Sequence, residues 1–322
     1  MNVLLTGAAG FIGFHAAKRL LEAGHVVIGV DNLNEYYSPR LKQARLDILA
    51  TYPNFEHHVL DLSEKDALNT SLGSENITHI LHLAAQAGVR YSLRNPHSYI
   101  QSNVVAHLNV LEYARQSKTV EHVAYASSSS VYGEREPGTG FKETDAVRNP
   151  ASLYAATKLS GELISESYTN LYGIRQTGLR FFSVYGPMGR PDMAYWLFTE
   201  KILAEEPITL FAPDIMRRDF TFVEDVVEIF PALLSSCPDY HKIYNLGNSN
   251  PNTLLDLVRA IEIACGKSAK TIIEPQQAGD VKNTFADISE AQRDFGFAPK
   301  TQLNEGIAAF VDWYRDWRSK QA

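Results

Sequence analysis

Tyr154 and Lys158 lie four residues apart in the run S-L-Y-A-A-T-K, which places both side chains on one face of a helix. A free tyrosine has a pKa of about 10 and is a poor base at neutral pH. An ammonium group nearby favours the phenolate, so the two residues can act together as a proton acceptor. Because such pairs also arise by chance in helices, this hypothesis needs support from the rest of the chain.

A run of four serines at residues 127–130 supplies that support. It follows a strand predicted at residues 122–126, and the carboxyl ends of parallel strands face the ligand crevice of their sheet. Ser128 can therefore hold a substrate oxygen against Tyr154.

The segment T-G-A-A-G-F-I-G at residues 6–13 places Gly7, Gly10 and Gly13 after the first predicted strand. Glycines at this point let the chain turn sharply and approach a pyrophosphate closely. The helix that follows begins near Gly10, with Phe11 and Ile12 in its first turn, and offers unpaired N–H groups to phosphate oxygens. The spacing is G-x-x-G-x-x-G, and in this context it predicts a dinucleotide site.

Asp31 ends the second predicted strand, eighteen residues beyond Gly13. A carboxylate there can accept hydrogen bonds from an adenosine ribose and would repel a 2'-phosphate, which favours NAD over NADP. Alternatively, Asp31 starts a turn with Asn32. We expect Asp61 and Leu62 near the adenine, and Leu83, Ala84 and Ala85 to leave room for the cofactor.

The composition excludes several other classes of protein. The formal net charge of -7 and the lack of a basic run argue against a surface for nucleic acid or anionic membranes. His82 is expected to be a packed histidine, and we predict no metal site. Cys237 and Cys265 give no disulfide framework, and no apolar run reaches about 18 residues, so we expect a cytoplasmic protein.

Short apolar runs alternate with helical patterns in the first half of the chain, which predicts an α/β fold with a doubly wound parallel sheet of the Rossmann type. The predicted strands are 2–5, 26–30, 55–59, 79–83, 122–126 and 175–179, and helices begin near Gly10, Pro39, Glu64, His97 and Ser152. We assign residues 1–179 to a dinucleotide-binding domain and 180–322 to a smaller α/β substrate-binding region, parts of which pack back on the first domain. A last helix over residues 303–317 should bury Ile307, Phe310 and Trp313.

The longer motifs of the chain resemble those of one superfamily. They are T-G-A-A-G-F-I-G, D-N-L-N-E-Y-Y, H-L-A-A-Q-A-G-V-R-Y-S, S-S-S-S-V-Y-G, S-L-Y-A-A-T-K, L-R-F-F-S-V-Y-G-P-M-G-R-P-D-M-A and R-R-D-F-T-F. This set resembles the extended short-chain dehydrogenase/reductase superfamily of NAD-dependent epimerases and dehydratases. Within it the chain looks like the UDP-glucuronate 4-epimerases, over residues 1 to about 290.

The resemblance implies a role for each residue of the reactive set. Tyr154 would remove the proton of the sugar C4 hydroxyl while hydride passes to NAD. Lys158 would hold the nicotinamide ribose and lower the pKa of Tyr154, and Ser128 would share the C4 oxygen. The 4-keto sugar would then rotate and take the hydride back on its other face.

The same resemblance separates this chain from related enzymes. Dehydratases of the superfamily have a sequence similar to T-D-E-V-Y-G at this position, where this chain has Ser129 and Ser130 in place of the Asp and Glu. UDP-glucuronate decarboxylases have a glutamate directly before the valine, where this chain has Ser130. A 4-keto uronate is a β-keto acid, so an epimerase must hold its carboxylate against loss of carbon dioxide. Ser183 and Arg190, in F-F-S-V-Y-G-P followed by G-R-P-D-M-A, are the candidate clamp.

Further substrate contacts are implied at Arg90, Ser129, Phe211, Arg218 and Asp280. Arg218 matches the position that binds the diphosphate, Asp280 would meet the UDP ribose, and Phe211 would stack on uracil. This chain reads F-A-P-D-I-M where uronate epimerases tend to have Asn-His-Gly after the aromatic residue. The departure bears on the preference for uridine.

Relatives form homodimers through a four-helix bundle, and the matching segments here are 97–117 and 152–172. Other interpretations remain open: a UDP-glucose/UDP-galactose 4-epimerase, a UDP-glucuronate decarboxylase, or a non-catalytic NAD-binding sensor or scaffold. The last class usually lacks the tyrosine or the lysine, and this chain has both.

Overall fold

The structure, a computed structural model, describes residues 1–73, 76–135, 139–236, 238–277 and 281–320. Cys237 and Asp280 lie outside the described residues. Within the described residues, every helix is too short or too polar to cross a membrane.

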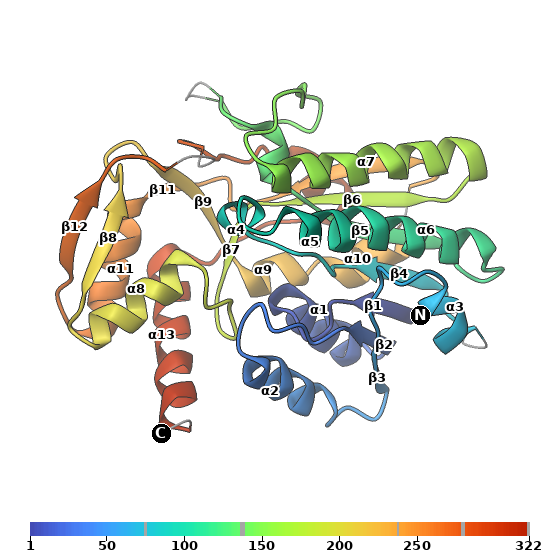
Figure 1. The fold of residues 1–322 in the computed structure, drawn as a ribbon, viewed down its shortest axis with the longest axis horizontal. Coiled ribbons are helices and arrows are strands. Elements are labelled where there is room, and N and C mark those ends of the chain that lie inside the picture. Colours follow the sequence, from blue (N-terminus) through green and yellow to red (C-terminus); the bar gives the residue numbers. More distant parts are fainter. Residues whose placement is uncertain (74–75, 136–138, 237, 278–280, 321–322) are drawn as a thin grey trace.

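A seven-stranded parallel sheet forms the centre of the larger part of the molecule (Figure 1). Its order is β10-β6-β5-β4-β1-β2-β3. The strands are β1 (Asn2–Thr6), β2 (Val26–Asp31), β3 (Phe55–Val59), β4 (His79–His82), β5 (His122–Ser128), β6 (Gln176–Phe181) and β10 (His241–Leu246). The order reverses between β1 and β4, as in a doubly wound sheet, so the predicted fold class is confirmed.

The strand predictions differ from the structure in two ways. Five of the six predicted strands have an end shifted by one or two residues, and β5 continues through Ser127 and Ser128. The seventh strand, β10, was not predicted; it pairs in parallel with β6 at the edge of the sheet. Since β10 lies beyond residue 180, part of the second region packs back on the first, and the boundary at residue 179 stays a prediction.

Helices cover both faces of this sheet. On one face Val3 and Leu5 of β1 share a core with α1 (Phe11–Glu22), α9 (Val223–Val227), α10 (Phe230–Ser235) and α12 (Ser289–Phe295). On the other, Leu4 packs with α3 (Ala67–Leu72) and α6 (Ala106–Gln116), beside α7 (Leu153–Tyr172). Alternate residues of one strand therefore serve two cores.

One predicted helix start is corrected by local structure. The third helix begins at Ala67 rather than near Glu64, because the Asp61 carboxylate accepts hydrogen bonds from the Ser63 N–H at 2.9 Å and hydroxyl at 2.7 Å. This turn delays the helix. The helix expected near His97 starts as α5 (Pro96–Ile100) and passes through a π-helical segment, Gln101–Val105, before α6. The short helix α4 (Val89–Ser92) was not predicted, and α2 (Pro39–Leu49) begins where expected.

The second region lies beside the sheet (Figure 1). Its side chains form a separate core rich in aromatic residues. Its elements are β7 (Ser183–Tyr185), α8 (Ala194–Leu203), β8 (Pro207–Phe211), β9 (Arg217–Phe222), β11 (Pro251–Thr253), α11 (Leu254–Cys265), β12 (Lys270–Glu274) and α13 (Leu303–Ser319). Ile307 and Phe310 of α13 are fully buried, and the Trp313 ring packs 5.4 Å from that of Trp196. The predicted packing role of this helix is confirmed.

A buried ion pair ties α7 to the central strands. The Arg180 guanidinium on β6 donates to both oxygens of Glu162 at 2.9 and 2.8 Å, and the Ser127 hydroxyl on β5 donates to the same carboxylate at 2.5 Å. Both charged side chains are almost fully buried, so their position is fixed by this pairing. The contacts hold α7, which carries Tyr154 and Lys158, against the end of β5.

Candidate active site

A cavity of about 420 Å³ opens at the carboxyl ends of the central strands, where the strand order reverses. All residues predicted to bind the cofactor line it: Gly7, Gly10, Phe11, Ile12, Gly13, Asp31, Asn32, Asp61, Leu62, Leu83, Ala84, Ala85, Tyr154 and Lys158. The predicted substrate residues Ser128, Ser129, Ser183, Arg190 and Arg218 line the same cavity.

The glycine-rich turn has the close contacts that a phosphate-binding turn requires. Gly7 has φ +75°, and a Cβ there would lie 2.8 Å from the Ala84 nitrogen on the neighbouring strand end. A Cβ at Gly13 would collide with the Gly7 carbonyl oxygen. Gly10 is the N-cap of α1, so the N–H groups of the first helical turn have no partner within the helix. The backbone therefore fits a pyrophosphate.

Asp31 makes the turn considered as one of its two roles, and its contact with a cofactor ribose stays a prediction. Its Oδ1 accepts the Leu33 N–H at 2.8 Å, which makes the turn, and its side chain also lines the cavity. The Lys42 amine lies 3.5 Å from Oδ1, and both side chains are buried. Burial lowers the pKa of Lys42, and Asp31 acts in the opposite direction. Lys42 was missed because nothing in the helical pattern of α2 marks it as a cavity residue.

Tyr154 lies beside Ser128 in the cavity. Burial raises the pKa of Tyr154, while hydrogen bonding with Ser128 and the charge of Arg190 lower it. The Ser128 oxygen also accepts the Ser130 N–H at 3.2 Å and hydroxyl at 2.9 Å. The Tyr99 ring meets the Tyr154 ring edge to face at 6.0 Å and limits where the phenol can lie.

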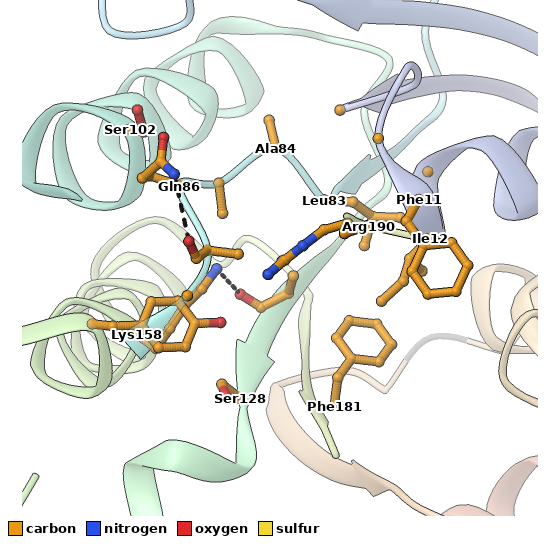
Figure 2. Close-up of a pocket in the computed structure, with 18 of the residues that line it drawn as sticks. Phe11, Ile12, Leu83, Ala84, Gln86, Ser102, Ser128, Lys158, Phe181 and Arg190 are labelled. Carbon is orange, nitrogen blue, oxygen red and sulfur yellow. Dashed lines mark hydrogen bonds between the residues drawn. The ribbon is translucent and has the colours of Figure 1, made fainter. Parts of the chain in front are cut away.

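Lys158 extends into the cavity from α7 (Figure 2). Its amine donates to the Ala126 carbonyl at 2.9 Å. Burial lowers the pKa of Lys158 to about 8, against the opposing effect of Glu162 one helical turn further on. The amine is therefore anchored to β5, and burial makes its charged form less favourable than in water.

Arg190 enters the cavity opposite Lys158 (Figure 2). Its Nε and Nη2 donate to the Asp192 carboxylate at 3.0 and 2.7 Å. The Tyr36 hydroxyl donates to the same carboxylate at 3.1 Å. Burial would raise the pKa of Asp192, yet Arg190 holds it below the usual value. Asp192 and Tyr36 were not predicted, although the spacing R-P-D could have indicated the ion pair.

The remaining predicted residues have different surroundings. Arg90 and Phe211 are described but do not line the cavity; they pack on each other, with the guanidinium 5.1 Å from the ring centre. Asp280 lies outside the described residues. His82 is buried, its Nδ1 is 2.7 Å from the Thr6 hydroxyl, and burial lowers its pKa well below the usual value, so it is a packed histidine as expected.

Comparison with known proteins decides the family. Residues 3–247 match the model of the NAD dependent epimerase/dehydratase family. This chain belongs to that family. Its members depend on NAD, and the cavity described above has the lining to hold it.

Related proteins cover nearly the whole chain. UDP-glucuronate 4-epimerase 4 of Arabidopsis thaliana is 42% identical over 99% of this chain and 76% of its own length. The structure of UDP-glucuronic acid 4-epimerase from Bacillus cereus with UDP-glucuronic acid and NAD matches with a TM-score of 0.92 and 32% identity, covering 98% of this chain and 100% of that one. The UDP-glucose 4-epimerase of Thermus thermophilus with NAD gives a TM-score of 0.88 at 31% identity, over 98% and 99% of the two chains.

We predict that Gly13→Ala will weaken NAD binding in this family member, because a methyl group would push against the Gly7 carbonyl and open the turn. Gly161→Ala is the matched control, since a Cβ there meets its nearest atoms at an ordinary 3.8 Å. NAD released by denaturing the purified proteins can be measured by chromatography. Equal NAD content in both variants would contradict the prediction.

Proposed function

We propose that the protein is an isomerase that interconverts UDP-glucuronate and UDP-galacturonate by NAD-dependent 4-epimerisation. The observation that carries this proposal is the Arg190 guanidinium in the same cavity as Ser128, Tyr154 and Lys158. The similarity to UDP-glucuronate 4-epimerases over nearly the full chain supports it.

In the proposed mechanism Tyr154 removes the C4 hydroxyl proton and later returns it. Bound NAD supplies the hydride acceptor and donor. Ser128 lies within reach of the Tyr154 phenol and holds the C4 oxygen, and Lys158 favours the phenolate through its charge. Once the C4 oxygen is a ketone, the sugar ring turns and presents its other face.

Arg190 and Ser183 hold the C6 carboxylate of the substrate in this proposal. The guanidinium keeps its Nε and Nη2 on Asp192, which leaves Nη1 as the proposed donor to the substrate. Loss of carbon dioxide requires the bond between C5 and the carboxylate carbon to lie parallel to the π orbitals of the C4 ketone. A carboxylate held in the ring plane cannot reach that orientation, so decarboxylation is suppressed. The nucleotide would lie toward Arg218, with Ser129, Arg90, Phe211 and Asp280 as the further proposed contacts.

Incubation of the purified, NAD-loaded protein with UDP-glucuronate tests the proposal directly. Chromatography should resolve UDP-galacturonate as the product. A UDP-pentose product would instead identify a decarboxylase. Conversion of UDP-galactose without conversion of UDP-glucuronate would identify a neutral-sugar epimerase and overturn the assignment.

Arg190→Ala should impair uronate turnover much more than neutral-sugar turnover. Loss of a hydrogen bond to a charged group costs about 1–3 kcal/mol of transition-state stabilisation. We expect kcat/KM for UDP-glucuronate to fall by the factor that corresponds to this free energy. The measurement is kcat/KM for UDP-glucuronate and UDP-galactose in both proteins. Equal losses on the two substrates would mean that Arg190 is purely structural.

The rate should rise with pH as the Tyr154 phenol loses its proton, because only the phenolate can act as the base. Burial raises the pKa of Tyr154, and the positive charge of Lys158 opposes that effect; burial lowers the pKa of Lys158 to about 8, so the opposing charge is lost as the pH rises through that value. The Lys158→Met variant lacks the positive charge, so the pH at which its rate rises should be higher than in the wild-type protein. Initial rates from pH 6 to 10 measure both profiles, and an unshifted rise in the variant would exclude this coupling.

We also propose a homodimer through a four-helix bundle of α6 and α7 from two copies. The two helices are joined by the Tyr168 hydroxyl, which donates to Glu112 at 2.6 Å, and they leave Leu108, Leu163 and Leu171 exposed. Leu163→Asp should convert the dimer into a monomer in light-scattering measurements. Ile263→Asp, on the exposed side of α11, is the control and should leave the mass unchanged. A monomeric wild-type protein would exclude this interface.

We place the protein in the cytoplasm, as a proposal that follows from its cysteines. Cys265 is a buried free thiol, which suits a reducing compartment. Cell fractionation would test the placement, and recovery outside the cytoplasmic fraction would overturn it.

A further inference from the structure

Arg45 on α2 is a fully buried arginine that lies outside the cavity lining. Its guanidinium makes four hydrogen bonds, and each ends on a neutral oxygen. The Arg45 Nε is buried without a partner among the described residues, so these four bonds satisfy the donors of the two terminal nitrogens and couple the positions of the oxygens to that of Arg45.

The two terminal nitrogens of Arg45 reach two different parts of the site. Nη1 donates to the Ala9 carbonyl in the glycine-rich turn and to the Tyr37 hydroxyl, both at 2.7 Å. Nη2 donates to the carbonyls of Met188 and Gly189 at 2.6 and 3.0 Å. One planar group thus connects the cofactor turn with the loop that ends in Arg190.

His15 on α1 holds the preceding carbonyl of the same loop. Its Nε2 lies 2.9 Å from the Pro187 oxygen. Burial lowers the pKa of His15 to about 4, so the ring is neutral at physiological pH and Nε2 must carry the hydrogen it donates. Three consecutive carbonyls, at 187, 188 and 189, are therefore held from the cofactor side.

The loop needs such contacts, because Met188 has φ +56° in the left-handed region that non-glycine residues rarely adopt. Surrounding contacts must hold a backbone in this conformation. Arg190 follows two residues later, and Tyr36, next to Tyr37, donates to its partner Asp192. The conformation at Met188 is part of the backbone course that leads directly to Arg190.

We propose that Arg45 is a positioning residue for Arg190, which transmits the arrangement of the cofactor turn to the group that recognises the substrate carboxylate. This inference rests on the proposed function. An arginine with only a packing role would have no need to aim its two terminal nitrogens at two separate loops. A lysine has a single ammonium and does not have the planar fork that reaches both.

The first experiment compares the affinities of the NAD-loaded protein for UDP-glucuronate and UDP-glucose by calorimetry. In Arg45→Met the preference for UDP-glucuronate should fall about tenfold, the effect of weakening one charge-assisted hydrogen bond. Arg45→Lys should give an intermediate loss and serves if the methionine variant does not fold. Arg40→Met, an exposed residue on the same helix, is the matched control and should keep the preference.

Combination with Arg190→Ala distinguishes a positioning role from a structural one. If Arg45 acts through Arg190, adding Arg45→Met to Arg190→Ala should leave the remaining preference unchanged. Equal weakening of both ligands, or losses that multiply in the double variant, would overturn the proposal.

Hydrogen exchange separates failure of this inference from failure of the proposed function. Without substrate, the amides of residues 186–193 should exchange faster in Arg45→Met than in the Arg40→Met control. If these amides in Arg45→Met exchanged at the wild-type rate, the proposed role of Arg45 would be overturned. A wild-type protein with no preference for UDP-glucuronate, together with faster exchange in the variant, would overturn uronate recognition and leave Arg45 as the residue that holds the loop.

Discussion

Positive charge inside this protein must be matched by protein oxygens, and that requirement shapes the site. The cations Lys158, Arg180, Arg190 and Arg45 are all buried or largely buried. Lys158 donates to a main-chain carbonyl, Arg180 and Arg190 each pair with a carboxylate, and Arg45 donates to three carbonyls and a tyrosine hydroxyl. Removing any of these oxygens would leave a charge without compensation, so the surrounding elements are tightly constrained.

The catalytic geometry follows from two of these pairings. Lys158 and Glu162 lie one turn apart on α7 and contact neighbouring residues at the end of β5, the Ala126 carbonyl and the Ser127 hydroxyl. Arg180 adds β6 to the same group. Ser128 is the next residue on β5, and Tyr154 lies one turn before Lys158 on α7. The contacts of Lys158, Glu162 and Arg180 therefore set the distance between Ser128 and Tyr154. This explains how a helix and a strand distant in sequence present one reactive pair.

The sequence allowed prediction of the sheet and of the cavity lining, because both depend on local pattern and on the rule that parallel strands end at the crevice. It could not reveal β10, whose short and partly polar sequence becomes a strand only through pairing with β6. Lys42 and Arg45 were missed for a similar reason. On a helix, basic residues usually face water, and only the packing of α2 against the site buries them. Phe211 and Arg90, both proposed substrate contacts, pack on each other, and their sequence separation gave no sign of that contact.

The ion pair between Arg190 and Asp192 has a consequence for how the substrate is recognised. A buried guanidinium without a partner would attract any anion strongly, and that attraction would stabilise bound substrate and transition state alike. Paired with Asp192, the group is electrically neutral overall, and in its proposed role it would select a substrate by the direction of the Nη1 donor. We infer that binding depends on a carboxylate placed in the correct plane, which is also the plane in which decarboxylation of the 4-keto sugar is disfavoured. Recognition of the substrate and protection of the intermediate are then one geometric property of the same loop.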